Sequence, residues 1–430
     1  MGRHRDLLDR HRQVLPSWLA LLYGEPIAIV EGSGRRVTDA EGRSYLDFFG
    51  GILATISGYA VPEVVAAVQE QAARMMHTST LYLIESQIEL AEEISRLSGI
   101  PDAKVFFTNS GTEANDAALM MATRYRRSNQ VLAMRNSYHG KSHSTVAITG
   151  NAAWSATPFS PFHTVYLHGG YRYRSPFADR SDADFIAAAV ADLRDLLAIA
   201  VAGDVACLVA EPIQGVGGFA LPPDGLYGAL EAVLDEHGIL FISDEVQTGW
   251  GRTGEHFWGY EAHGVTPDLL TFAKGVGNGL PVAGVVGRAE VIDCLPANSI
   301  STFGGNPLVT AGALANIRYL REHDLQRNAL EVGQVLRSEL EDLQREVPAI
   351  GDVRGKGLMI GIDLVSPGSD APDPDLARRV LEEARRGGLL LGKGGLQGNV
   401  LRVAPPLSIT REEAVEGLTI TSEAVRRAAG

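Results

Sequence analysis

The sequence predicts an α/β fold in which a mostly parallel sheet is covered by helices on both faces and a smaller α+β domain lies beside it. A chain of 430 residues is long enough for two or three domains. In its middle part, short apolar runs alternate with stretches of helical periodicity. Such runs are typical of parallel strands buried on both faces. After about residue 309, long helical patterns replace this alternation and indicate a different unit.

The first sixty residues contain short strand patterns separated by turns, at Ile27–Glu31, Arg36–Asp39 and Tyr45–Phe48. Apolar residues then recur at helical spacing over Val61–Met76 and Ile84–Leu97. Five apolar runs that end in small or polar residues predict strands of the main sheet: Val105–Phe107, Val131–Met134, Cys207–Ala210, Leu240–Ile242 and Leu269–Ala273.

The C-terminal part has helical periodicity over Ala311–His323 and Ala329–Arg345, followed by a strand pattern at Met359–Leu364. The polar segment Tyr171–Asp184 is expected to be an excursion on the surface. We predict a large domain and a smaller domain built from both chain ends, with these bounds: 1–60 (small), 61–308 (large) and 309–430 (small).

Composition predicts a soluble globular protein, with 45% hydrophobic and 21% charged residues. A net charge of −14 argues against nucleic acid or an anionic membrane as the main partner. The first dozen residues are polar and no apolar stretch reaches ~18 residues, so we expect neither a signal peptide nor a membrane span. Cys207 and Cys294 form no disulfide framework, which favours a cytoplasmic location.

The first candidate for chemistry is the segment Ser110–Thr112, which follows a strand and opens a helix. The N–H groups at a helix start, with hydroxyls beside them, can bind an anion such as a phosphate. The alternative is an ordinary N-cap made by Ser110 or Thr112.

Lys274 and Asp244 each end an apolar strand pattern. A lysine there can attack a carbonyl carbon once burial favours its neutral amine. A carboxylate at the tip of a buried strand needs a cationic or N–H partner, because unpaired burial is costly. The alternatives are a surface lysine at a strand exit and, for Asp244, an N-cap or a salt bridge with Arg252.

Two further residues could contact a ligand. Tyr138 follows a strand and could stack on a planar ring or simply pack in the core, and Arg402 is a lone guanidinium in an apolar stretch that needs a carboxylate or phosphate. The sequence lacks the usual zinc, Walker, hydrolase and dinucleotide motifs. His139 and His143 are four residues apart but have no thiolate or carboxylate beside them, so we expect no metal site.

These parts fit one ligand, pyridoxal phosphate (PLP), which stabilises carbanions next to an amine. Lys274 would form a Schiff base with its aldehyde, Asp244 would keep its ring nitrogen protonated, Tyr138 would stack on the ring, and Ser110–Thr112 would hold the phosphate.

The chain resembles the class III aminotransferases of PLP fold type I over nearly its whole length. The main sheet of that family has seven strands, which the resemblance implies for this chain. The resemblance rests on eight motifs in the family's order: SGTEAN (110–115), YHG (138–140), EPIQG (211–215), DEVQTGWGRTG (244–254), AKGVGNGLP (273–281), TFGGNP (302–307), VRGKGLMIG (353–361) and LRVAPPL (401–407).

The resemblance implies that Lys274 is the catalytic lysine, which moves protons, and that Asp244 pairs with the cationic ring nitrogen of the cofactor. It implies a homodimer in which Thr302 reaches the phosphate of the neighbouring subunit, and it makes Arg402 a clamp for a substrate carboxylate. Val246 would pack against the ring face opposite Tyr138, and Gln247 would contact the ring hydroxyl. The implied cofactor-binding set is Ser110, Gly111, Thr112, Tyr138, His139, Glu211, Asp244, Val246, Gln247, Lys274 and Thr302.

Departures from relatives bear on the substrate. Members that alternate between ω-amino donors and 2-oxoglutarate usually carry a glutamate that neutralises the arginine, where this chain has Val216. Lys141 stands where those members tend to have an arginine, and Ile52 stands where ornithine enzymes have a tyrosine. We count Ile52, Lys141 and Arg402 as the substrate-binding residues. This pattern looks most like the alanine–glyoxylate aminotransferase 2 branch.

The expected reaction moves an amino group from a small amino acid, alanine-like or ω-amino, to a keto acid in two half-reactions. The alternatives are a 4-aminobutyrate:2-oxoglutarate aminotransferase and, within the same family, a decarboxylase or an aminomutase. A relative that has lost activity is disfavoured because four residues of the family's site are present, namely Lys274, Asp244, Gln247 and Thr302. A demand for an external keto acid separates a transaminase from the other enzymes.

Overall fold

The computed structural model describes residues 3–430 and contains two seven-stranded sheets. The larger sheet has the order β4-β10-β9-β8-β7-β5-β6. Its strands are β4 (Ala103–Thr108), β5 (Gln130–Met134), β6 (His163–Leu167), β7 (Val205–Ala210), β8 (Leu240–Asp244), β9 (Leu269–Phe272) and β10 (Ala283–Arg288). The pairs from β9 through β8, β7 and β5 to β6 are all parallel. The predicted α/β class with a mostly parallel sheet is confirmed.

Strand β10 is the exception, because it runs antiparallel to both β4 and β9. The sequence analysis predicted neither β10 nor β6. The five predicted strands are present. Four of them are one to three residues longer than predicted, and β9 ends one residue earlier.

The smaller sheet has the order β1-β2-β3-β13-β14-β12-β11. Its strands are β1 (Ile29–Ser33), β2 (Arg36–Asp39), β3 (Ser44–Phe48), β11 (Ile350–Lys356), β12 (Met359–Leu364), β13 (Leu389–Gly394) and β14 (Val400–Val403). Strand β3 pairs in parallel with β13, with Leu46 opposite Leu389. One sheet thus joins segments from both ends of the chain.

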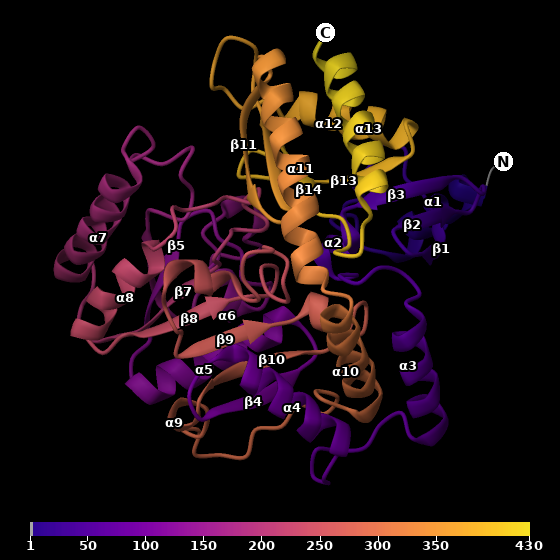
Figure 1. Ribbon diagram of the computed structural model, residues 1–430. Helices are drawn as coiled ribbons and strands as arrows, with labels where there is room; N and C mark the ends of the chain where they lie inside the picture. Colours follow the sequence, from indigo (N-terminus) through magenta and orange to yellow (C-terminus); the bar gives the residue numbers. More distant parts are fainter. Residues whose placement is uncertain (1–2) are drawn as a thin grey trace.

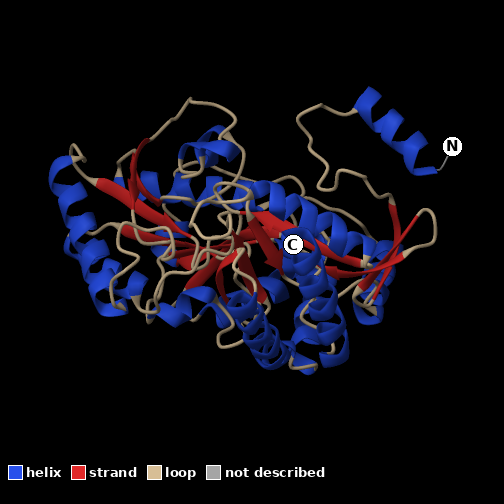
Figure 2. Cartoon of the chain, turned by 90° about the horizontal axis from the view of Figure 1, so that it is seen from above, coloured by secondary structure: helices blue, strands red, loops and turns tan. Residues whose placement is uncertain are grey.

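Helices lie on both sides of the strands, as Figure 2 shows from above. They are α1 (Arg3–Val14), α2 (Gly50–Leu53), α3 (Pro62–Arg74), α4 (Glu85–Ser98), α5 (Gly111–Arg126), α6 (His143–Ala147), α7 (Asp182–Ile199), α8 (Leu226–Glu236), α9 (Ala289–Ile292), α10 (Pro307–Glu322), α11 (Leu325–Glu346), α12 (Pro374–Arg386) and α13 (Arg411–Ala429). In Figure 1, α10 lies beside the larger sheet and α11 continues toward the smaller one. Short 3-10 turns occur at Ala152–Trp154, Gly259–His263 and Lys274–Gly277.

Local sequence explains where several helices begin. The hydroxyl of Ser110 accepts a hydrogen bond from the N–H of Glu113 (3.2 Å) and caps α5. Asn306 caps α10 in the same way, and Pro307 occupies its first position. Helix α5, rich in buried alanines, packs closely against β7, β9 and β10.

The segment Tyr171–Asp184 lies at the surface as predicted, and none of its residues is fully buried. Its first residues are half-buried and contact the smaller sheet, where the Tyr171 hydroxyl donates to Asp363 (2.7 Å). Its last three residues belong to α7. Two polar side chains of this surface segment, Tyr171 and Arg174, thus bond to the smaller sheet, while residues 179–184 are exposed to solvent.

Candidate active site

The predicted site residues gather at one edge of the larger sheet. Strands β5, β7, β8 and β9 are parallel, and β4 points the same way because it and β9 both run antiparallel to β10. Their carboxyl ends therefore lie along one edge, where open α/β sheets bind ligands. The residues that follow these ends are Ser110, Tyr138, Glu211, Asp244 and Lys274.

Asp244 is buried at the end of β8 and accepts hydrogen bonds from three neighbouring donors. Its Oδ2 accepts hydrogen bonds from Asn115 Nδ2 (2.8 Å) and His139 Nδ1 (2.8 Å), and its Oδ1 accepts from the N–H of Val246 (3.1 Å). A carboxylate oxygen has two lone pairs, so Oδ1 can still accept a hydrogen bond from a ligand. The salt bridge with Arg252 that we considered is wrong.

Arg252 is instead fully buried between the two sheets, where it donates to the carbonyl oxygens of Leu358 (3.1 Å) and Pro405 (2.5 Å). Burial lowers the pKa of its guanidinium to about 9. It joins the two parts of the chain and does not contact Asp244.

Asn115 is a site residue to which the sequence analysis gave no role, although it ends the motif SGTEAN. Its amide donates to Asp244 and to the carbonyl oxygen of His139 (2.8 Å), while its own oxygen accepts from the Thr271 hydroxyl (2.7 Å). The available signal was its position in the helix that begins after Ser110. Helical spacing turns the Asn115 side chain toward the sheet edge.

We predict that Asn115→Ala weakens PLP binding about tenfold, because Asp244 loses a buried donor that fixes its orientation. The dissociation constant of PLP, measured by fluorescence quenching of the apoprotein, checks this. Thr123→Ala in the same helix, whose hydroxyl bonds only to its own helix, is the control. An unchanged constant in Asn115→Ala contradicts the assigned role.

Lys274 is half-buried directly after β9, in a backbone conformation with φ of 47°. Burial lowers the pKa of its ammonium, and the Arg402 guanidinium acts in the same direction, whereas the Asp244 and Glu211 carboxylates raise it. The net result is a pKa of about 8. A lysine with this pKa supplies a neutral amine near neutral pH far more readily than an exposed one. The amine is therefore suited to attack a carbonyl carbon.

Glu211 lies buried at the end of β7 and ties two loops together. Its two carboxylate oxygens accept from the N–H groups of Tyr138 (2.9 Å) and Gly215 (2.8 Å). Burial raises the pKa of this carboxyl to about 7, and the negative charge of Asp244 acts in the same direction. Tyr138 is half-buried, and its ring packs edge-on against Trp154 at 5.3 Å between centroids.

The start of α5 and the residue Val246 enclose a narrow space. A Cβ atom on Gly111 would lie only 3.0 Å from Val246, and one on Gly140 would lie 2.7 Å from the Thr112 hydroxyl. Glycine is therefore required at position 140, where φ is also 137°, and it is favoured at position 111. The first N–H groups of a helix have no acceptor within it, and Gly111 and Thr112 supply two of them. The Ser110 N-cap and a phosphate site are thus compatible.

Arg402 on β14 has a guanidinium that is only 5% exposed. Its Nε donates to the carbonyl oxygen of Lys393 (3.1 Å) and its Nη1 to that of Gly215 (3.3 Å), while Phe49 and Phe219 flank it at 4.8 and 5.5 Å. Across residues 3–430, no carboxylate lies within 4.0 Å of it. Burial lowers the pKa of this guanidinium to about 10.

Val216 lies buried beside Arg402, as its motif implied. Its carbonyl oxygen accepts from the N–H of Gly395, and the Cβ position of Gly394 lies 3.0 Å from both that oxygen and Arg402. The Val216 backbone therefore lies close to Arg402, and its side chain carries no charge.

No hydrogen bond within residues 3–430 links Ile52, Lys141 or Thr302 to this cluster. Ile52 is 46% exposed and has a left-handed backbone with φ of 64°. Lys141 and Thr302 are exposed and have no hydrogen bond or ion pair within the described chain. Residues 3–430 also hold no group of three or more potential metal ligands and no helix able to cross a membrane.

Comparison with known proteins identifies the family. Residues 23–425 match the model of the class-III aminotransferases. This chain belongs to the class-III aminotransferases. It is 40% identical over 414 residues to the mitochondrial alanine–glyoxylate aminotransferase 2 homolog 2 of Arabidopsis thaliana, covering 95% of this chain and 84% of the relative. It is 37% identical to the 4-aminobutyrate aminotransferase of Escherichia coli, covering 98% of each. The family also includes a leucine/methionine racemase of Thermococcus litoralis, 36% identical over 98% of this chain and 96% of the relative.

Solved structures agree with this assignment. An (S)-enantioselective omega-transaminase of Thermomicrobium roseum superposes with a TM-score of 0.92 at 31% identity and covers all of both chains. A PLP-bound amine transaminase from an uncultivated Pseudomonas species superposes with a TM-score of 0.88 at 31% identity, covering 94% of this chain and 95% of the other. The class-III aminotransferase described here is a PLP-dependent transaminase.

The residues present fit PLP, and an unpartnered buried atom supports this. The Oε1 atom of Gln247 is buried without a hydrogen-bond partner in the described chain, so a ligand hydroxyl at that point would satisfy it. When bound, PLP supplies an electron sink for a carbanion. Lys274 would hold the cofactor and carry protons, Asp244 would accept a hydrogen bond from the ring nitrogen, and the start of α5 would bind the phosphate.

Proposed function

We propose that this class-III aminotransferase transfers the amino group of a small, alanine-like amino acid to a small keto acid. The observation that carries the proposal is the buried Arg402 guanidinium, which has carbonyl and aromatic neighbours but no carboxylate beside it. Such a cation is suited to a bidentate contact with a substrate carboxylate.

The surroundings of Arg402 favour substrates that bear this carboxylate in both half-reactions. Val216 takes the place of the glutamate that neutralises the arginine in relatives with ω-amino donors. With no acidic side chain there to compete, Arg402 stays available for the donor and for the keto acid. Alanine with glyoxylate fits this requirement, and the Arabidopsis relative is named for that pair.

The second candidate is the transfer from 4-aminobutyrate to 2-oxoglutarate. The exposed ammonium of Lys141 could bind a distal carboxylate as a point charge, and the Escherichia coli relative is named for this donor. This candidate requires that Arg402 binds no carboxylate while the donor is bound. With valine at position 216, the side chain there cannot neutralise the guanidinium.

The proposal is tested by product analysis with the holoenzyme. Incubation with L-alanine and glyoxylate should yield pyruvate and glycine in equal amounts, and kcat/KM for this pair should exceed that for 4-aminobutyrate with 2-oxoglutarate. A higher value for the second pair would favour the second candidate. Release of carbon dioxide, an amino group moved within one molecule, or formation of D-alanine without a keto acid would identify a decarboxylase, an aminomutase or a racemase instead.

We also propose a homodimer in which Thr302 completes the partner's phosphate site. Thr302 is exposed within its own chain, and exposed apolar residues surround it in sequence, among them Ile300 and Phe303. Phe303 packs against His77 with 5.1 Å between ring centroids, and the exposed residues Leu81–Leu83 follow His77 closely in the sequence. Apolar patches of this kind are typical of protein interfaces.

Mixed dimers test the sharing of Thr302. A heterodimer of Lys274→Ala and Thr302→Ala chains should contain one intact site, with half the activity of the wild-type dimer and wild-type PLP affinity. If Thr302 served its own chain, the only lysine-bearing site would lack the threonine, and the heterodimer would bind PLP as weakly as the Thr302→Ala homodimer. A wild-type/Lys274→Ala heterodimer is the control.

Two further expectations belong to this proposal. The division into residues 1–60 and 309–430 on one side and 61–308 on the other follows the membership of the two sheets. A cytoplasmic location is supported by the two cysteines, of which Cys207 is fully buried with a thiol pKa raised by burial.

A further inference from the structure

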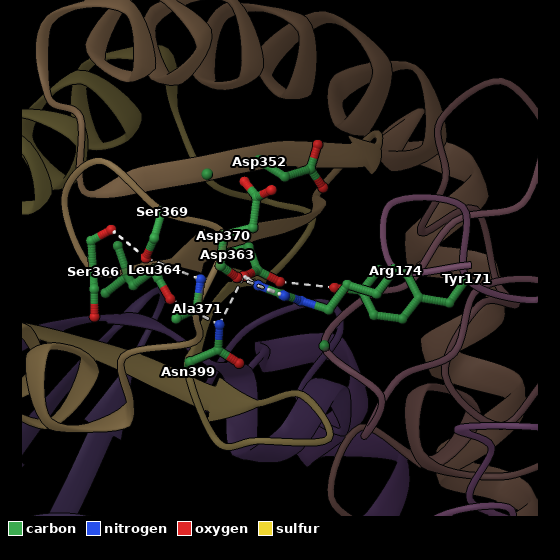
Figure 3. A network of polar contacts seen from close by, with 12 residues as sticks. Tyr171, Arg174, Asp352, Asp363, Leu364, Ser366, Ser369, Asp370, Ala371 and Asn399 are labelled. Carbon is green, nitrogen blue, oxygen red and sulfur yellow. Dashed lines mark hydrogen bonds and ion pairs between the residues drawn. The ribbon is translucent and has the colours of Figure 1, made fainter. Parts of the chain in front are cut away.

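A network of buried polar contacts centres on Asp363 of β12, outside the site described above. Asp363 is completely buried, and its carboxylate accepts from the Tyr171 hydroxyl (2.7 Å), Arg174 Nη2 (2.6 Å) and Asn399 Nδ2 (2.7 Å). Figure 3 shows Tyr171 and Arg174 reaching Asp363 from the loop that follows β6, and Asn399 reaching it from the β13–β14 connection. The network thus joins the larger-sheet part of the chain to the smaller sheet.

Arg354 of β11 connects this network to the active site. Its Nη1 donates to Asp352 (2.6 Å) and lies 3.5 Å from Asp363, and its Nη2 donates to the carbonyl oxygen of Gly218 (2.8 Å). The guanidinium also lies over the Tyr171 ring, 4.8 Å from its centroid. The fixed fork of an arginine allows these contacts to be made at the same time.

Gly218 belongs to the turn Gly215–Phe219, which holds Arg402. The carbonyl oxygen of Gly215 accepts from Arg402, and the Phe219 ring lies against its guanidinium. Phe219 is completely buried with φ of 53°, a left-handed conformation that is unfavourable for a bulky residue and persists only where its surroundings impose it. The hydrogen bond from Arg354 to the Gly218 carbonyl oxygen holds the peptide group between Gly218 and Phe219.

We propose that Arg354, fixed by Asp363 and Tyr171, is a positioning residue for the binding of the substrate carboxylate. It holds the Gly215–Phe219 turn, and through that turn it sets the place of the Arg402 guanidinium. The inference rests on the proposed role of Arg402. It differs from a purely structural role, because it predicts a selective effect on ligands that carry a carboxylate.

The test uses Arg354→Lys in the holoenzyme, since lysine keeps the charge but cannot make the forked contacts. We expect KM for L-alanine and the dissociation constant of propionate to rise about tenfold, while kcat changes less than about twofold. Tyr171→Phe, which removes one hydroxyl and keeps the ring, should change the same constants in the same direction by about two- to fivefold. The matched control is Arg385→Lys, another buried arginine with two ion-pair partners, and should leave both constants unchanged.

A double-mutant cycle with Arg402→Ala separates the possible failures. If Arg354 acts through Arg402, Arg354→Lys should add no further loss of propionate affinity in the Arg402→Ala background. Equal losses in both backgrounds, or a fall in kcat without a change in propionate binding, would overturn the positioning role alone. If Arg402→Ala itself left propionate binding unchanged, the proposed role of Arg402 would be wrong, and this inference with it.

Discussion

Lys274→Ala should lower kcat by about four orders of magnitude, the largest effect expected of any single substitution in this enzyme. The substitution removes both the amine that would hold the cofactor and the group that would carry protons at the reacting carbon. The other contacts of the site, from Asp244, Gln247 and the start of α5, are unaffected. The variant should therefore still fold and still bind PLP without a covalent bond, which circular dichroism and PLP titration would show. Activity near that of the wild type would rule out the assigned role of Lys274.

The lowered pKa of Lys274 adds a pH dependence to this prediction. Below about pH 8 the side chain is mainly an ammonium and cannot attack a carbonyl carbon, and above that value it is mainly neutral. The rate at which apoprotein and PLP form the covalent holoenzyme should rise with pH and level off above about pH 8. A rate that continued to rise toward the pKa of an exposed lysine, 10.5, would show that burial does not activate this amine.

Arg402→Ala should have the second largest effect and should discriminate between donors. Removing one partner of a buried, hydrogen-bonded charge pair costs about 3–5 kcal/mol, or about two to four orders of magnitude in kcat/KM for a carboxylated donor such as alanine. A simple amine without a carboxylate loses no such contact, so its kcat/KM should change about tenfold at most. Equal losses for both donors would show that Arg402 is a structural residue, held by the carbonyl oxygens of Lys393 and Gly215.

Arg402→Lys provides the control for charge. It keeps a cation but loses the planar fork, so it should restore part of the preference for alanine and not all of it. Complete restoration would show that the site needs only a positive charge.

Much of the active site could be predicted from the sequence. Its residues lie at the ends of strands, and short local runs of apolar residues reveal those strands. The ends of β8 and β9 at Asp244 and Lys274 are of this kind. Strand β10 escaped prediction because its sequence AGVVGR contains two glycines and gives no alternation, and its place is fixed by pairing with β4. That pairing joins residues far apart in the chain.

Side-chain partners were the least predictable feature. Asn115, the buried Arg252 and the contacts of Tyr171 depend on which distant segments meet, and no local pattern encodes this. The valine at position 216 was visible in the sequence, but only the fold shows that no carboxylate among residues 3–430 lies within 4.0 Å of Arg402.

The most direct test of the central claim is the absorbance spectrum of the purified holoenzyme, titrated with single amino donors and no acceptor. The account predicts a PLP band that L-alanine converts completely to the pyridoxamine form and that returns when glyoxylate or pyruvate is added. A PLP band that no amino donor converts, or that alanine leaves unchanged while the amino acid is racemised or decarboxylated, would contradict it.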